Sequence, residues 1–332
     1  MSAAPRRYDV CNGDADGLCA VLQWRLHDRA RSTLVTGLKR EIELLRRVPV
    51  GQADEVLVCD LSLARNREPL RRLLDAGARV RYFDHHFAGD VPIHDKLEVH
   101  LDASPEVCTS LLVDRHLGGA FHAWALVGAY GDALTAVAHR RAAAAGFNGK
   151  RRAALQRLGE AINYNAYGDD EQDVHIAPAA LYAIMSRYAD PLEMLAREHV
   201  IDELDALRRD DLRRGMMVVP TLRTDHARLV ALPDAPWSRR VIGTLANELA
   251  GAAPRQAQAV LKHTGAGSYV VSVRAPKATP HGAHVLCEAF GGGGRAAAAG
   301  IDALPAGELE RFIAAFGHMH WEAGVLPTVG AS

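Results

Sequence analysis

The stretch YDVCNGDADG, residues 8–17, decides the expected fold of this 332-residue chain. Its first half, residues 8–12, is expected to be the first strand, and its second half places Asp14 and Asp16 beside Gly13 and Gly17. The glycines permit tight turns. Residues two apart in an extended chain point the same way, so both carboxylates are expected to reach one spot at the end of a strand.

Over the first hundred residues, short β-branched runs alternate with amphipathic segments. The run EVLVCD, residues 55–60, is apolar nearly throughout, as expected of a strand covered on both faces. Strands are expected at 8–12, 33–36, 55–60, 78–84 and 97–101, and helices at 17–29, 67–76 and 104–117. This alternation indicates βαβ units and a parallel sheet.

The pattern of residues changes twice in the second half of the chain. Residues 121–214 are rich in helix formers, whereas after Gly215 the runs MMVVPTLRT (216–224), ARLVALP, AQAVLKHT and SYVVSVRAP are typical of strands, with one helix at 238–250. The chain is therefore expected to be an α/β protein of two domains. Residues 1–200 would form a parallel-sheet domain with a helical connector, and residues 215–326 a smaller α/β domain, with the active site in the cleft between them.

Composition excludes several classes of protein. The 39 basic residues balance 40 acidic ones, so no basic field is available to attract long duplex DNA. The five cysteines are odd in number and widely spaced, which indicates reduced, buried thiols rather than a disulfide framework. No signal sequence and no apolar stretch of transmembrane length is present, so a cytoplasmic protein with no membrane partner is expected.

Acidic and imidazole residues fall where the predicted strands end. The carboxyl ends of parallel strands form one rim, and ligands bind there at the topological switch point. Carboxylates gathered in one place repel one another and raise their pKa values unless cations neutralise them, so a bound divalent metal is the simplest remedy. The residues concerned are Asn12, Asp14, Asp16, Asp60, Asp84, His85 and His86, with Asp132 in a later helical segment.

Each of these fragments alone also fits an ordinary structural role. DAD followed by glycine is often a solvated turn, a strand-terminal Asp60 is often a helix cap, and paired histidines often lie in polar loops. The residues GD at 131–132 fit a helix end and a cap. The metal-site interpretation therefore depends on the joint occurrence of these fragments, in order, at strand ends.

Four motifs in this order resemble those of the DHH phosphoesterase family. They are NGDADG (12–17), VLVCD (56–60), FDHH (83–86) and GAYGDA (128–133). The later segment FGGGGRAAAAG (290–300) resembles the glycine-rich signature of the DHH-associated carboxy-terminal domain. Together the motifs span nearly the whole chain, and the exopolyphosphatase-like and nano-RNase-like members are the nearest in character.

The resemblance implies a hydrolase that cleaves phosphodiester or terminal phosphate bonds of short nucleotide substrates, as a short-oligonucleotide exonuclease or a pAp phosphatase does. An exopolyphosphatase acting on linear polyphosphate is one alternative, and a non-catalytic nucleotide-binding member is another. Aromatic side chains that stack on bases would favour nucleotides, but the candidates Tyr269 and Phe290 also fit a core role. The expected partner is a short nucleotide or phosphate-rich small molecule, and a dimer is the expected state if the chain self-associates.

The resemblance also implies a site of two Mn²⁺ ions, with Co²⁺ or Mg²⁺ as alternatives. Asp60 would bridge the ions, Asp14 would bind one, and Asp16, His85 and Asp132 would complete the other. His86 would contact the phosphate and assist proton transfer, with Asp84 orienting the neighbouring imidazole. The predicted catalytic residues are His86, Asp84 and Asp60.

The chain departs from the family pattern at three positions. Nuclease members usually have Asp where this chain has Asn12, and other members have His where it has Val10. One metal site is therefore expected to be weak, with Asn12 as a neutral candidate ligand. Many relatives have His where this chain has Arg295. We expect Arg295 to clamp a substrate phosphate beside the backbone of four glycines, which are Gly291, Gly292, Gly293 and Gly294.

Overall fold

The computed structural model describes residues 5–264, 267–321 and 323–325. The chain divides into two units, Met1–Leu207 and Arg208–Ser332, and each unit has its own sheet. The predicted end of the second domain, at residue 326, lies outside the described residues. The α/β class, with a parallel sheet followed by a second α/β sheet, is confirmed.

The first unit is built on a five-stranded sheet in the order β2-β1-β3-β4-β5, in which every neighbouring pair is parallel. The chain moves outward from β1 to β2 and then returns to the other side of β1 to form β3. Ligands bind at this kind of reversal in open α/β sheets. The strands are β1 (Arg7–Asn12), β2 (Thr33–Gly37), β3 (Glu55–Cys59), β4 (Arg79–Asp84) and β5 (Leu97–Leu101).

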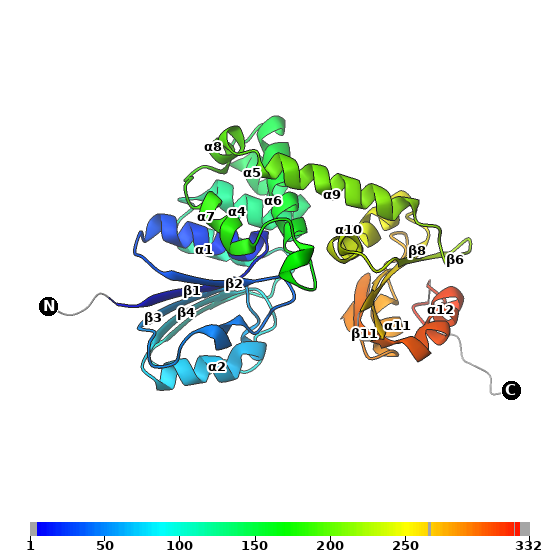
Figure 1. Ribbon diagram of the computed structural model, residues 1–332, viewed down its shortest axis with the longest axis horizontal. Helices are drawn as coiled ribbons and strands as arrows, with labels where there is room; N and C mark the ends of the chain where they lie inside the picture. The colour runs from blue at the N-terminus through cyan, green and yellow to red at the C-terminus, as the bar shows by residue number, and fades with distance from the viewer. Residues whose placement is uncertain (1–4, 265–266, 322, 326–332) are drawn as a thin grey trace. The chain divides into compact units, whose positions relative to one another are not determined.

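Helices cover both faces of this sheet, which explains the apolar run in β3 (Figure 1). Val56 and Val58 belong to the core cluster under α2 (Leu63–Asp75). Leu57 and Cys59, which alternate with them, belong to the cluster that includes α1 (Ala15–His27). Because strand side chains alternate between faces, a strand buried on both sides needs apolar residues at every position.

A group of helices continues the layer over α1. The cluster around α1 also takes in α3 (Thr109–His116), α4 (His122–Gly131) and α6 (Gly149–Asn165). The remaining helical elements are η1 (Leu44–Arg47), α5 (Thr135–Ala144), η2 (Glu171–Asp173), α7 (Pro178–Met185), α8 (Pro191–Arg197) and α9 (Val200–Met217). Across the described part of the chain, no helix combines the length and apolarity needed to cross a bilayer. All five cysteines are free and buried, as predicted.

The second unit has a six-stranded mixed sheet in the order β10-β11-β9-β8-β7-β6, whose only parallel pair among the described residues is β7 with β8. Its core lies between the sheet and the last two helices. The elements are β6 (Leu222–Arg223), β7 (Ala227–Leu232), α10 (Pro236–Ala252), β8 (Ala257–Thr264), β9 (Ser268–Arg274), α11 (Ala283–Glu288), β10 (Gly293–Arg295), β11 (Ala298–Pro305), η3 (Ala306–Glu308) and α12 (Leu309–His318).

Two expected elements were wrong. The helix expected at 104–117 begins only at Thr109, because Ser104 closes a turn with its N–H on Asp102 at 3.1 Å. The strand expected at 216–224 is the end of α9 followed by the two-residue β6. Met217 and Val219 in that segment are not core residues, since they are 77% and 82% exposed.

Candidate metal centre

The polar residues after β1, β3 and β4 lie at the carboxyl ends of adjacent strands, as the sequence predicts. The chain leaves β1 into α1 on one face of the sheet and leaves β3 into α2 on the other face (Figure 1). The two connections therefore diverge to opposite faces of the sheet. This arrangement places the candidate residues at the switch point of the sheet.

The turn after β1 differs from the expected extended segment. Helix α1 already begins at Ala15, and Asp14 is its N-cap, with one carboxylate oxygen accepting the Gly17 N–H at 3.0 Å. Gly13 is required by close packing, because a Cβ there would lie 2.0 Å from the Gly37 carbonyl oxygen at the end of β2. Asp14 and Asp16 consequently have different partners rather than pointing together.

Asp16 binds the first turn of α3. Its two oxygens accept the backbone N–H groups of Thr109 at 2.7 Å and Ser110 at 2.8 Å. The carboxylate is 1% exposed, and it satisfies helix N–H groups that have no partner within their own helix. Asp16 thus joins α1 to α3 as well as facing the centre.

Asp60 follows β3 in a left-handed conformation, with φ of 59°. Aspartate tolerates this region better than most non-glycine residues. Its buried Oδ1 accepts a hydrogen bond from the Thr109 hydroxyl at 3.3 Å and lies 3.4 Å from His85 Nε2. The conformation turns the side chain toward the residues that follow β4.

His85 is oriented by a backbone carbonyl. Its Nδ1–H donates to the Val107 oxygen at 3.1 Å, which leaves Nε2 as the nitrogen that can bind a metal. Nε2 lies 3.4 Å from Asp60, 3.8 Å from Asp132 and 4.0 Å from Asp16. Asp132 reaches this point as the residue that ends α4. We call His85, Asp16, Asp60 and Asp132 the ligand cluster.

His86 and Asp84 form a pair beside the ligand cluster. His86 Nδ1 lies 2.7 Å from Asp84 Oδ1, while the His86 side chain is 45% exposed. Asp84 is fully buried, and no donor among the described residues reaches its second oxygen. The hydrogen bond holds the ring through Nδ1, which also lies 3.9 Å from Asp60 Oδ1.

The cluster is strained electrostatically without a cation. Burial, together with the carboxylates of Asp14 and Asp16, raises the pKa of Asp60 well above its usual range. Burial also raises the pKa of Asp132 to about 6. Burial of the His85 ring opposes its charge, but the hydrogen bond to Asp60 and the charge of Asp16 prevail and raise its pKa to about 10. A proton on His85 therefore supplies positive charge at the position where a metal would bind.

The donors fit a divalent metal. The ligating atoms of Asp16, His85 and Asp132 lie within 4.8 Å of one another, and so do those of Asp60, His85 and His86. A mixed set of carboxylate oxygen and imidazole nitrogen suits Mn²⁺ and similar ions. The Val107 contact supplies the second partner that metal-binding histidines usually have.

Sequence reasoning missed Lys39, which lies just after β2. Its ammonium group donates to Asp14 Oδ2 and, at 3.3 Å, to Asn163 Oδ1. Asn12 is engaged nearby: its oxygen accepts the Asp14 N–H at 3.3 Å, and its nitrogen donates to the Lys39 carbonyl at 3.3 Å. No motif marks Lys39, because its contacts are made only when β2 lies beside β1.

The glycine-rich segment lies in the second unit, where it forms a hairpin. Gly291 and Gly294 have positive φ values of 75° and 144°. A Cβ at Gly292 would lie 2.2 Å from the Gly300 carbonyl oxygen, and one at Gly294 would lie 2.5 Å from the Ala299 Cα, so these two glycines allow close packing against β11. Gly293 and Arg295 are exposed, and the Arg295 side chain makes no hydrogen bond or ion pair with other described residues.

The two aromatic candidates for base stacking are partly buried against the core of the second unit. Tyr269 packs edge-on against His263 at 5.2 Å between ring centroids, and Phe290 packs edge-on against Phe312 at 5.3 Å. Arg311 covers the Phe290 ring at 4.8 Å. These contacts give both residues a structural role.

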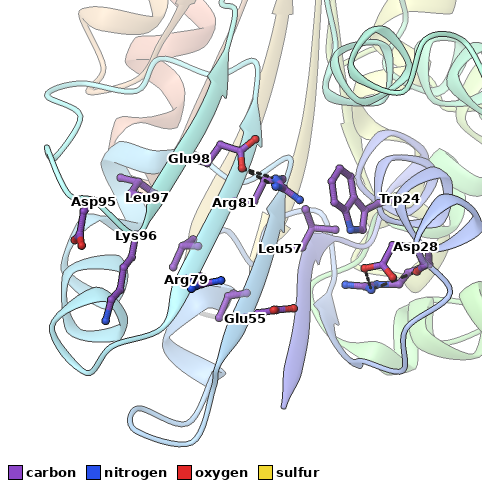
Figure 2. A pocket seen from close by; sticks show the side chains of 13 residues that line it. Trp24, Asp28, Glu55, Leu57, Arg79, Arg81, Asp95, Lys96, Leu97 and Glu98 are labelled. Carbon is purple, nitrogen blue, oxygen red and sulfur yellow. Dashed lines mark hydrogen bonds and ion pairs between the residues drawn. The ribbon is translucent and has the colours of Figure 1, made fainter. Parts of the chain in front are cut away.

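A separate pocket of about 320 Å³ lies on β3, β4 and β5 at the other ends of the strands (Figure 2). Several of its charged side chains are paired, for example Arg81 with Glu98 at 2.6 Å. Glu98, which lines the pocket, also forms a third group of potential metal ligands with His100 and His116. Because Glu98 already binds both Arg81 and His100, we assign no metal to this group.

No family model and no curated protein matches this sequence. Solved structures do match. The exonuclease RecJ bound to manganese superposes with a TM-score of 0.59 and 21% identity, covering 93% of this chain and 88% of that chain. RecJ in complex with Mn²⁺ from Thermus thermophilus gives 0.54 and 20%, covering 93% of this chain and 51% of that one, so this chain spans about half its length.

A third match is the pGpG-specific phosphodiesterase PggH from Vibrio cholerae. Its TM-score is 0.51 at 13% identity, covering 94% of this chain and 97% of that chain. At these identities the likeness concerns the fold. Three of the four motifs lie at strand ends and the fourth ends α4. Together with this placement, the likeness leads to one conclusion: the chain has the fold of the DHH phosphoesterases.

Proposed function

We propose that this chain is a divalent-metal-dependent phosphoesterase that hydrolyses phosphodiester or terminal phosphate bonds of short nucleotides, with Mn²⁺ as the ion. One observation carries the proposal: His85 Nε2, freed by the Val107 carbonyl, lies 3.4 to 4.0 Å from three separate carboxylates. An arrangement of buried like charges around one imidazole is costly unless a cation binds there. The exonuclease RecJ, which shares the fold, has been solved with bound manganese.

The ligand cluster would hold the ion, and Thr109 would keep Asp60 in place through its hydroxyl. A bound divalent ion supplies a hydroxide nucleophile at neutral pH and neutralises charge on a phosphoryl oxygen. The residues around it set the direction of attack, because each carboxylate is fixed by its own strand or helix end. Asp16 is the most constrained of them, since it already accepts two backbone N–H groups.

His86 would contact the phosphate and move a proton. Its Nδ1 is held by the buried Asp84, which leaves Nε2 of this half-exposed side chain as the nitrogen that could reach a substrate. A carboxylate behind an imidazole fixes its tautomer and stabilises the protonated ring. The protonated ring can bind a phosphoryl oxygen or donate its proton to the leaving oxygen.

Arg295 is proposed to bind substrate without entering the chemistry. Its guanidinium is exposed at the end of β10 and can hold a phosphate through two parallel hydrogen bonds. A fork of this kind on the second unit favours substrates with more than one phosphate, such as pAp or a short oligonucleotide.

The proposal is tested by substrate screening with a matched pair of variants. Purified protein is assayed with Mn²⁺ on pAp, short RNA, cyclic dinucleotides, pyrophosphate and polyphosphate, before and after chelation. His85→Asn should abolish turnover. His94→Asn should not, because the His94 ring lies outside the ligand cluster and contacts its neighbours Asp95 and Lys96, each at 3.1 Å.

Release of nucleotide products that stops on chelation and returns with Mn²⁺ supports the proposal. Turnover confined to polyphosphate would instead identify an exopolyphosphatase. Binding of nucleotides with no hydrolysis of any substrate would identify a non-catalytic member. Full turnover in the chelated protein would refute metal-dependent hydrolysis.

A further inference from the structure

Lys39 places its ammonium group at the metal centre rather than in solvent. Its side chain is 24% exposed. Its backbone is held on both sides, because its N–H donates to the Ala166 carbonyl at 3.0 Å and its own carbonyl accepts from Asn12 at 3.3 Å. The ammonium donates to Asp14 and to Asn163 at 3.3 Å. Contacts at both ends fix the position of this charge.

Both oxygens of Asp14 already have partners. One accepts the Gly17 N–H at 3.0 Å, and the other accepts the Lys39 ammonium. Asn12 adds no negative charge, and its side-chain oxygen accepts the Asp14 N–H. A divalent ion bound through Asp14 would therefore share this carboxylate with a partly buried ammonium group, and Asn12 would add no negative charge to compensate.

The balance of charge at the centre agrees with this geometry. Asp14 and the three carboxylates of the ligand cluster carry four negative charges when ionised. One divalent ion and the Lys39 ammonium supply three positive charges, which leaves the centre slightly negative. A second divalent ion would place a dication beside an ammonium in a partly buried site, where like charges repel strongly.

The Lys39 ammonium also interacts electrostatically with Asp132 and Asp60. Burial of Lys39 opposes its charge, yet the carboxylate of Asp14 and the nearby Asp132 and Asp60 keep its pKa well above the usual value. The same ammonium opposes the effect of burial on Asp132. The contacts to Asp14 and Asn163 hold this ammonium group beside the acidic residues.

We propose that this centre binds a single divalent ion, at the ligand cluster, and that the Lys39 ammonium replaces a second ion as a fixed positive charge. Its role in holding a phosphoryl oxygen of the substrate rests on the proposed function, whereas the number of bound ions does not. This replaces the expectation of two Mn²⁺ ions, with Asp14 holding one of them.

The number of ions is measured on the full chain by elemental analysis after Mn²⁺ loading and desalting, and by calorimetric titration. The wild type should bind one ion per chain. Its electron paramagnetic resonance spectrum should be that of an isolated Mn²⁺ ion rather than of an exchange-coupled pair. The double variant Asn12→Asp/Lys39→Met, which restores a carboxylate and removes the ammonium, should bind two ions and show exchange coupling.

Two further variants separate charge from folding effects. Lys39→Arg keeps the positive charge and should still bind one ion. Lys150→Met removes an exposed lysine at the start of α6 and should behave as the wild type. Two ions with exchange coupling in the wild type would overturn the proposal. A folded double variant that binds only one ion would also overturn it, because Lys39 would then not be what excludes the second.

Failure of this proposal and failure of the proposed function are distinguishable. A protein that binds one Mn²⁺ ion but hydrolyses no phosphate ester would refute the enzymatic role and leave the single-ion centre standing. A protein that hydrolyses nucleotides with two bound ions would do the reverse.

Discussion

Binding of Mn²⁺ should release a proton from His85. In the metal-free protein, burial of the ring opposes its charge, but Asp60 and the other carboxylates raise the pKa of His85 to about 10. The ring must lose the Nε2 proton to bind a metal, so metal and proton compete for one nitrogen. The direction follows: Mn²⁺ affinity should rise with pH.

The size of the effect follows from the pKa of His85. At pH 7 the ring lies about three pH units below its pKa, and one unit corresponds to about 1.4 kcal/mol, so removing the proton costs about 4 kcal/mol. The Mn²⁺ affinity should therefore increase about tenfold per pH unit between pH 7 and 9. Asp132, whose pKa is raised by burial to about 6, is already ionised in this range and should add to the slope only below it.

Calorimetric titration in two buffers of the same pH but different ionisation enthalpy, such as HEPES and Tris, counts the released protons. About one proton per Mn²⁺ ion is expected at pH 7.5. His85→Asn should lose the release, whereas His94→Asn should retain it. Zero protons released, together with an affinity that stays constant from pH 7 to 9, would refute the assignment of His85 Nε2 as a ligand.

Three other outcomes are expected. With chelator present, the free energy of unfolding in urea should fall as pH rises from about 6.5 to about 10. The reason is that His85 holds its proton more tightly in the folded protein than in the unfolded chain. A rise in the free energy of unfolding over this interval would contradict the direction of the His85 pKa. Asp16→Asn should cost about 2–4 kcal/mol in the same assay, since one of two charge-assisted bonds to α3 is lost and an amide N–H then faces a backbone N–H. Asp132→Asn, which removes a buried charge from the same cluster, should leave the metal-free protein as stable or more stable, so equal losses in the two variants would refute the α3-capping role. Arg295→Ala should raise KM for pAp while leaving kcat and Mn²⁺ binding unchanged, and Arg295→Lys should recover part of the loss; a fall in kcat at constant KM would place Arg295 at the scissile phosphate instead.

The sequence alone was sufficient for the sheet and for the position of the centre. Alternation of apolar strands with amphipathic helices is a local property, and it predicted the five parallel strands of the first unit. Where a parallel strand ends is also local, so Asp60 and His85 could be placed on one rim before any contact was known. Local patterning failed at 216–224, because exposed and buried apolar residues look alike in a sequence.

Tertiary structure decided how each of these residues is used. Asp16 binds Thr109 and Ser110, some 93 positions away, and these bonds rather than a local cap begin α3. The Val107 carbonyl selects the metal-binding nitrogen of His85. Neither contact has a sequence pattern, because any residue can supply a backbone N–H or carbonyl.

Lys39 is the clearest case of a role that only the tertiary structure reveals. It meets Asp14 because β2 pairs in parallel with β1 and brings its carboxyl end to the same rim. In the sequence it is an ordinary lysine in a loop, where a solvated side chain is the usual expectation. The sequence determined which charged side chains reach the rim, because their place there depends on where the strands end. The pairing of the strands determined which of these charges neutralise one another, because neutralisation depends on distances that exist only in the folded chain.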